Sequence, residues 1–138
     1  MKKITLLIIA IALMQSCAFE GTESFEGFIS RFETDDLFME SRISDDFYIE
    51  EFEKQGDGSP INKRQIKGAP SAYTYDGRIY PSSNQQKKLD ISLYLRIKIA
   101  NDIRVMTLKS PYDEDIAHYW FYCVDGVWIL ESKVIGNR

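Results

Sequence analysis

Polar and apolar positions between residues 89 and 99 alternate with a period of two. The apolar members of this series are Leu89, Ile91, Leu93, Leu95, Ile97 and Ile99. Period two is the spacing of a β-strand that has one buried face and one wet face. The pattern therefore predicts a long strand over 89–99. We expect 103–108 to pair back against it after the turn at Asn101-Asp102.

Two apolar and aromatic segments, 117–124 and 127–135, flank the dipeptide Asp125-Gly126. Asp-Gly is typical of a two-residue type I′ turn, so these segments are predicted to form a hairpin. Strict alternation places six side chains on the core face: Tyr119, Phe121, Cys123, Trp128, Leu130 and Ser132. The opposite face is expected to hold His118, Trp120, Tyr122, Val124, Val127, Ile129, Glu131 and Lys133.

Helical periodicity is found early in the chain. A first helix, with Ser24 as its N-cap, is predicted by apolar residues at i, i+3, i+4 and i+7, namely Phe25, Phe28, Ile29 and Phe32. A second helix is expected to begin at Thr34 or Asp35. Its apolar residues are Leu37, Phe38, Met39 and Ile43.

The middle of the chain carries weaker signals. Residues 47–52 are predicted to form the first strand, and 55–67, where turn residues cluster, is expected to be the least ordered part. A second Asp-Gly dipeptide indicates a small hairpin over 73–80. Residues 81–88 are interpreted as a polar connection.

Helices followed by a run of strands define the α+β class, in which helices cover one face of a sheet. We expect a single α+β domain over 24–138, with two N-terminal helices packed on a curved antiparallel sheet. Its length is that of one ordinary domain.

The N-terminus has a different pattern. A basic start at Lys2 and Lys3 precedes an apolar run over 4–14, which Thr5 alone interrupts, and Cys17 follows shortly after. Eleven residues are too few for a spanning helix, which needs about 20, and they match the core of a signal peptide. The order of these features resembles a bacterial lipoprotein signal peptide.

This resemblance implies that 1–16 is a signal peptide and that 17–23 is a lipidated cysteine with a short tether. Cys17 would carry a diacylglyceryl group, with a further acyl chain on its amine, and would hold the protein to a membrane. Ala18 is not Asp, which in such lipoproteins implies the outer membrane. The face of the membrane is left open, and plain secretion or an uncleaved anchor remain alternatives.

Charge narrows the classes of partner. The full chain has a net charge of −4, and loss of Lys2 and Lys3 leaves fifteen basic and twenty-one acidic residues, a net charge of −6. An acidic domain repels nucleic-acid phosphates and anionic lipid surfaces. We therefore expect no nucleic-acid partner, and we expect membrane attachment to depend on the lipid at Cys17.

No catalytic constellation is evident. If Cys17 is lipidated, Cys123 has no internal partner and is expected to be a buried thiol. His118 is the only histidine, too few ligands for a metal site, and a hydrogen-bonded or surface role is favoured. We predict no metal, no cofactor and no assigned catalytic residue, although the question of enzyme activity stays open.

Aromatic residues offer the better candidate for function. Five of them are predicted to form a binding surface: Tyr73, Tyr75, Tyr80, Trp120 and Tyr122. Tyr and Trp provide large contact areas at low entropic cost. The alternative is that these rings pack under the loops or against the helices.

The helical start, the long late strand and the final hairpin Phe121–Leu130 resemble the NTF2-like cone. The segments Phe25–Phe32 and Asp36–Ile43 also resemble uncharacterised bacterial lipoproteins. Because NTF2-like folds host enzymes, binding cups and adaptors, the resemblance implies a fold and no single activity. We expect a lipid-anchored envelope protein that binds a protein, peptide or glycan without catalysis. The alternative is a small-molecule cup, with isomerase or hydrolase activity as one version of it.

Overall fold

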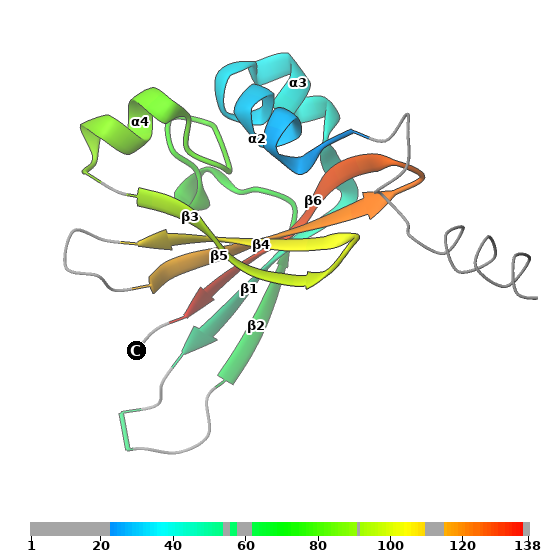
Figure 1. The fold of residues 1–138 in the computed structure, drawn as a ribbon. Helices are drawn as coiled ribbons and strands as arrows, with labels where there is room; N and C mark the ends of the chain where they lie inside the picture. The colour runs from blue at the N-terminus through cyan, green and yellow to red at the C-terminus, as the bar shows by residue number, and fades with distance from the viewer. Residues whose placement is uncertain (1–22, 54–55, 58–61, 91, 110–114, 137–138) are drawn as a thin grey trace, which may run out of the picture.

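The computed structural model describes residues 23–53, 56–57, 62–90, 92–109 and 115–136. Three helices, α2 (Phe25–Thr34), α3 (Asp36–Ser41) and α4 (Ser83–Lys88), accompany one sheet (Figure 1). Its strands are β1 (Ile43–Glu53), β2 (Asn62–Lys67), β3 (Ser92–Ala100), β4 (Ile103–Lys109), β5 (Asp115–Val124) and β6 (Val127–Gly136). This arrangement confirms the α+β class. The predicted signal peptide and Cys17 lie outside the described residues.

The six strands lie in the order β2-β1-β6-β5-β4-β3, and the sheet is strongly curved (Figure 1). Four of the strand pairs are antiparallel, but β1 runs parallel to β6. The expectation of a wholly antiparallel sheet is therefore wrong. Each antiparallel pair joins strands that follow one another in the sequence, whereas β1 and β6 come from opposite ends of the domain, where no hairpin dictates direction.

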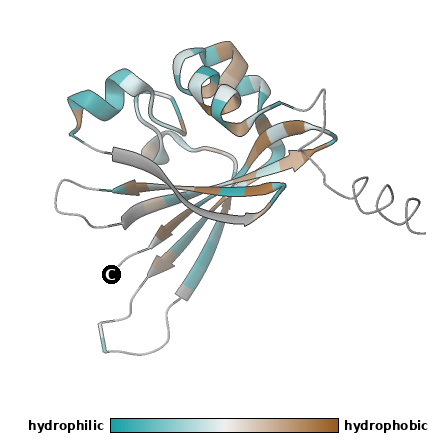
Figure 2. Ribbon diagram, in the orientation of Figure 1, coloured by the Kyte–Doolittle hydropathy of each residue, from teal (hydrophilic) through white to brown (hydrophobic). Residues whose placement is uncertain are grey.

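Helices α2, α3 and α4 all lie on one side of the sheet (Figure 1). Phe25, Phe28 and Phe32 point from α2 onto Phe121 of β5, each with ring centroids 5.6 Å from the Phe121 ring. Trp128 of β6 closes this cluster, 4.9 Å from Phe25. Apolar residues accordingly line the facing sides of the helices and strands (Figure 2). Edge-to-face aromatic packing thus holds the helices on the sheet.

Local capping explains where both early helices begin. The Ser24 hydroxyl accepts from the Gly27 amide at 3.1 Å, which confirms the predicted cap of α2. Asp35 caps α3 by accepting from the Phe38 amide at 3.0 Å, and this bond lowers the pKa of Asp35. The expected second helix is too long, because Ile43 begins β1. The Arg42 carbonyl accepts from the Leu130 amide at 2.8 Å, so the backbone joins the sheet there.

Residues 62–67, expected to be poorly ordered, form the edge strand β2 against β1. Lys63 pairs with Glu50 at 2.8 Å across the two strands. Most described side chains of β2 are exposed and Ile66 alone among them packs partly buried against the core, so one apolar position is too little to produce an alternating sequence pattern. Backbone pairing to β1 therefore defines an element that hydrophobic periodicity could not show.

The segment between β2 and β3 also differs from expectation. The Asp76-Gly77 turn is present, with φ of 50° and 85°, but the predicted hairpin is reduced to one bridge between Tyr75 and Arg78, preceded by a 3-10 turn at Ser71–Tyr73. Residues 83–88, interpreted as a connection, form α4. A capping box between Ser82 and Gln85 starts this polar helix, which has no apolar stripe to reveal it.

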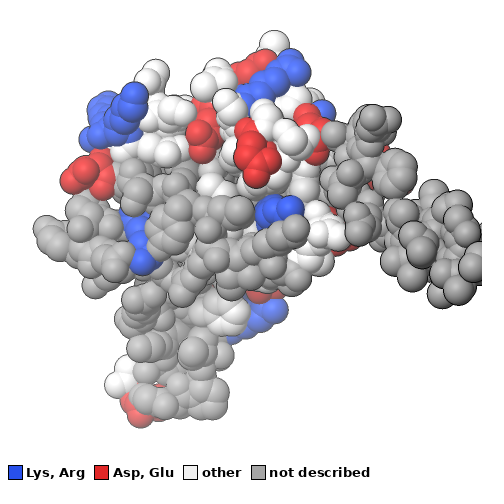
Figure 3. All heavy atoms as spheres, in the orientation of Figure 1, with Lys and Arg blue, Asp and Glu red and all other residues white. Residues whose placement is uncertain are grey.

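Both predicted late hairpins are confirmed. Strand β4 pairs with β3, and β5 pairs with β6 about Asp125-Gly126, with φ of 50° and 80°. The expectation of one buried and one wet face on β3 concerns side chains at 91–99 that lie outside the described set. Acidic and basic groups are interspersed over the helical side of the described surface (Figure 3).

A β-bulge at Glu131 breaks the alternation of β6. Phe121 pairs with Leu130, but the next residue of β5, Trp120, pairs with Ser132. The extra residue turns the following side chains over, so that Lys133 lies opposite Tyr119 and is only 3% exposed. The prediction that Lys133 lies on the polar outer face is therefore wrong.

Cys123 lies on β5 opposite Trp128 and packs partly buried against the core. Its sulfur is in a disulfide bond, which contradicts the expectation of an unpaired thiol. Among the described residues, no helix is both long enough and apolar enough to cross a membrane.

Candidate functional site

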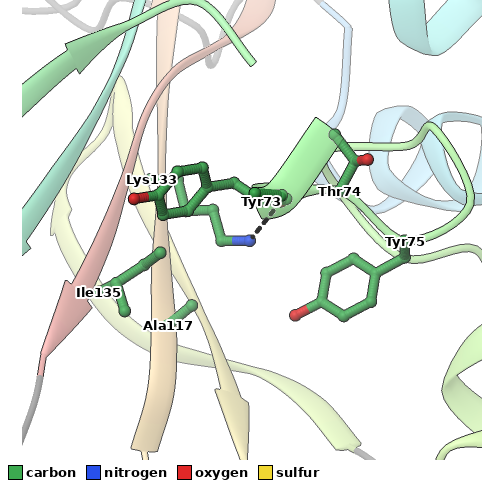
Figure 4. A pocket seen from close by; sticks show the side chains of 7 residues that line it. Tyr73, Thr74, Tyr75, Ala117, Lys133 and Ile135 are labelled. Carbon is green, nitrogen blue, oxygen red and sulfur yellow. Dashed lines mark hydrogen bonds between the residues drawn. The ribbon is translucent and has the colours of Figure 1, made fainter. Parts of the chain in front are cut away.

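A pocket of about 180 Å³ opens between the 72–75 segment and strands β5 and β6 (Figure 4). The apolar part of its wall comes from small side chains and tyrosine rings. Its lining residues are Ala72, Tyr73, Thr74, Tyr75, Ala117, Lys133 and Ile135. A cavity of about 150 Å³ is enough to hold benzene, so this pocket has room for a small organic molecule.

Lys133 supplies the charged group of the pocket. The bulge at Glu131 directs this side chain to the inner side of the sheet, where its Nζ donates to the Tyr73 carbonyl at 3.1 Å (Figure 4). The ammonium also lies 5.0 Å from the ring centroid of Tyr75 and 5.3 Å from that of Tyr119. These cation–π contacts partly replace the water that burial removes.

Burial lowers the pKa of Lys133 from 10.5 to about 8. The physical cause is desolvation, which disfavours the charged form of an amine. Within the described part of the chain, no carboxylate lies at ion-pair distance from this ammonium. Among the described residues, this buried cation contacts one backbone carbonyl and the faces of two tyrosine rings.

The 3-10 turn and the Asp76-Gly77 turn position the two pocket tyrosines. Tyr73 donates its hydroxyl to Glu51 of β1 at 3.0 Å, which fixes its ring across the sheet. The Tyr75 carbonyl accepts from Gln85 at 2.7 Å, so α4 supports this wall from behind. Burial raises the pKa of Tyr75, whose hydroxyl shares a hydrogen bond with Tyr119.

The structure divides the five predicted surface aromatics into three groups. Tyr73 and Tyr75 line the pocket. Tyr80 is completely buried beside Tyr119, with ring centroids 4.8 Å apart, so it belongs to the core instead of a docking surface. Trp120 and Tyr122 are half-buried and alternate with the core residues of β5, so they lie on the opposite face of the sheet.

Sequence reasoning missed Lys133, Ala117 and Ile135 as pocket residues. Strict alternation assigned Lys133 to the wet face, and nothing in the local sequence marks the bulge that moves it. The sequence offered one weak signal, a lysine directly before the apolar pair Val134-Ile135 late in the final hairpin.

A second, more polar pocket of about 290 Å³ lies between α2–α3 and the start of α4. Arg78, only 8% exposed, pairs with Asp36 and donates to the Phe32 carbonyl at 2.9 Å. Glu33 accepts from the Tyr80 hydroxyl at 3.1 Å and from the Ser83 hydroxyl at 3.3 Å. These groups satisfy one another and tie the helices together, so we interpret this pocket as structural.

His118 lies on β5 with its Nδ1 3.0 Å from the Thr107 hydroxyl. This geometry confirms a hydrogen-bonded strand histidine. In the described ranges, no group of three or more His, Cys, Asp or Glu side chains is arranged to hold a metal ion.

The solved structures that resemble this fold include two from Bacteroides species. An NTF2-like protein from Bacteroides fragilis matches with a TM-score of 0.51 and 16% identity, over 85% of this chain and 48% of that one. A cystatin-like protein from Bacteroides caccae matches with a TM-score of 0.53 and 14% identity, over 84% of this chain and 78% of that one. The chain thus spans about half the length of the first structure.

No protein-family model matches the chain, and none of the curated proteins matches it either. The structural likeness defines an NTF2-like, cystatin-like α+β fold and supports the fold expected from the sequence. At these identities the likeness concerns the fold alone, so function has to be argued from the site.

Proposed function

We propose that this protein is a small-molecule-binding domain of the bacterial cell envelope. The observation that carries the proposal is the pocket around Lys133, where a buried cation and two tyrosines converge on an apolar cavity of about 180 Å³. Ligand sites combine mostly apolar walls with a few well-placed polar groups, and this pocket has that composition.

The location at the envelope rests on the N-terminal sequence. The basic start, the short apolar run and Cys17 support lipid attachment at the outer membrane after removal of residues 1–16. Two or more acyl chains are needed for stable anchoring, and a lipoprotein cysteine carries them. Cys17 is the only other cysteine in this sequence, so a lipid on Cys17 would leave Cys123 without an internal disulfide partner. We therefore propose that the Cys123 disulfide is absent from the lipidated protein.

Ligand capture provides the direct test. The chain from residue 18 onward is exposed to an extract of its own cells and examined by native mass spectrometry. We expect a small-molecule adduct that Ala72→Trp abolishes, because the indole would fill the pocket from the exposed rim. Ser71→Trp is the matched control, since Ser71 is equally exposed but does not line the pocket.

An adduct that survives Ala72→Trp, in a variant with an unchanged thermal unfolding curve, would contradict the pocket as the binding site. Absence of any small-molecule adduct from the unmodified domain would contradict the proposed function itself.

Trp120 and Tyr122 support a second candidate function, docking of an envelope protein, peptide or glycan. They are half-buried neighbours on the face of β5 away from the pocket. Aromatic side chains of this kind are enriched at binding hot spots. In the same mass spectra, a retained protein or glycan that Trp120→Ala releases would favour this candidate over the cup.

A further inference from the structure

We propose that the pocket binds a small monocarboxylate whose apolar body lies against the tyrosine rings and whose carboxylate pairs with Lys133. This inference deepens the proposed function and rests on it. Three observations carry it: the charge of the pocket, the incomplete solvation of that charge and the shape of the remaining wall.

Lys133 is the one ionic side chain among the described residues that line the pocket. An ammonium has three N–H donors, and the Tyr73 carbonyl accepts one of them at 3.1 Å. The two rings offer only their faces to the charge, at 5.0 and 5.3 Å. A ligand carboxylate would accept the remaining donors and neutralise a cation that burial has stripped of water.

The groups that face this ammonium from neighbouring elements do not supply that anion. Tyr73 and Tyr75 come from the 71–75 segment, and Tyr119 comes from β5. On β1, Glu51 accepts the Tyr73 hydroxyl at 3.0 Å and makes no ion pair with Lys133 in the described structure. Because the pocket holds one positive charge that no described carboxylate neutralises, it should prefer a ligand with a single negative charge.

The other residues that line the pocket favour a ligand whose remaining part is small and apolar. Ala72, Ala117 and Ile135 contribute aliphatic surface, and Thr74 uses its hydroxyl proton on the Ser71 carbonyl at 2.9 Å. The volume of about 180 Å³ is slightly larger than a cavity of about 150 Å³ that holds benzene. Short-chain and aromatic monocarboxylates, from butyrate to phenylacetate, have the appropriate size.

Carboxylate binding should also take up a proton. Burial lowers the pKa of Lys133 to about 8, and a paired anion raises it again. Binding near pH 8, where the free amine is about half protonated, therefore takes up about half a proton per ligand from the buffer. Affinity should fall about tenfold between about pH 7 and pH 9, because the ligand requires the protonated amine.

Isothermal titration calorimetry tests the inference with butyrate, benzoate and phenylacetate, each compared with its neutral amide. We expect the acids to bind at least about tenfold more tightly than the amides, and the heat to depend on the ionisation enthalpy of the buffer at pH 8. Lys133→Met should remove the preference for acids. Lys87→Met, which removes a charge from exposed helix α4, should retain it.

Equal binding of acids and amides, or heat independent of the buffer, would overturn the inference. The comparison of acids with amides and the buffer dependence of the heat both use the unmodified domain. They therefore test the carboxylate inference even if Lys133→Met fails to fold. If no acid binds while the extract adduct blocked by Ala72→Trp is retained, the inference fails and the proposed function stands. If that adduct is also missing, both fail.

Discussion

Lys133 shows how one residue can combine a structural cost with a chemical use. Its side chain is 3% exposed and packs against tyrosine rings, so folding removes most of its hydration. Lowering the pKa of Lys133 from 10.5 to about 8 costs the native state about 3 kcal/mol of stability at neutral pH. Proteins retain such a penalty where the group has a task, which supports the assignment of the pocket as a binding site.

The lowered pKa of Lys133 predicts how the stability of the native protein changes with pH. Because the unfolded chain holds the Lys133 proton more tightly than the native protein does, native stability should rise with pH between about 8 and 10.5. Below about pH 8 the ammonium is charged in both states, and its full cost is present. We expect the unfolding free energy of the wild type, minus that of Lys133→Met, to increase by up to about 3 kcal/mol between about pH 7 and pH 10.5.

Urea unfolding at several pH values, followed by circular dichroism, measures this difference. Tyr80 and Tyr119 have raised pKa values because they are buried, so above about pH 10 they lower the stability of both proteins. Taking the difference between the two proteins cancels the contribution of Tyr80, and data below about pH 10 limit that of Tyr119, whose ring the ammonium contacts. A difference that does not change with pH would show that Lys133 is well solvated in the native state.

At the scale of elements, the final hairpin organises the site. Its turn fixes the pairing of Val124 with Val127 and brings Phe121 and Trp128 under α2. Its bulge then changes the side that Lys133 faces. A tight turn and a single extra residue in one strand therefore position both the core and the pocket.

The turn carries a prediction of its own. Gly126 has a φ of 80°, in the left-handed region that a Cβ disfavours. Gly126→Ala should destabilise the domain by about 1 kcal/mol in urea unfolding. Gly136→Ala, at the end of β6 where a new Cβ would meet no atom within 4 Å, is the matched control and should change stability little. Equal effects of the two substitutions would contradict this account of the turn.

At the scale of the whole molecule, the start of the described chain and the pocket lie toward opposite ends of β6. Glu23 donates its backbone amide to the Gly126 carbonyl at 3.2 Å and pairs with Arg42, so the chain enters the fold beside the β5–β6 turn. Lys133 lies six residues beyond Val127, which is about 20 Å along a strand. A lipid on Cys17 would thus hold the turn near the bilayer and leave the pocket away from it.

Membrane attachment can be tested with the two cysteines as a matched pair. When the full chain is produced in a bacterium, we expect it in the membrane fraction, and we expect Cys17→Ser to release it because the lipid has no attachment atom. Cys123→Ser should stay with the membrane. Intact mass spectrometry of the purified protein distinguishes an acylated cysteine from a disulfide, and a disulfide in the mature protein would contradict lipidation.

The predictions that were confirmed depend on short-range rules. Ser24 and the dipeptides Asp76-Gly77 and Asp125-Gly126 act through their own backbone geometry, and the pairings around 103–108 and 117–135 follow from adjacent strands. Helix α4 and strand β2 were missed since neither buries an apolar stripe. Their positions depend on partners elsewhere in the chain.

By itself, the sequence determined the α+β class, the first helix, the two late hairpins and the aromatic core, because period, caps and turn dipeptides act over a few residues. Only the tertiary structure decided the parallel pairing of β1 with β6, the bulge at Glu131 and the inward position of Lys133. The parallel pair joins strands far apart in the sequence, and the bulge inserts one extra residue into β6 that no local pattern marks. The pocket contains its charged group because the bulge turned Lys133 to the inner side of the sheet.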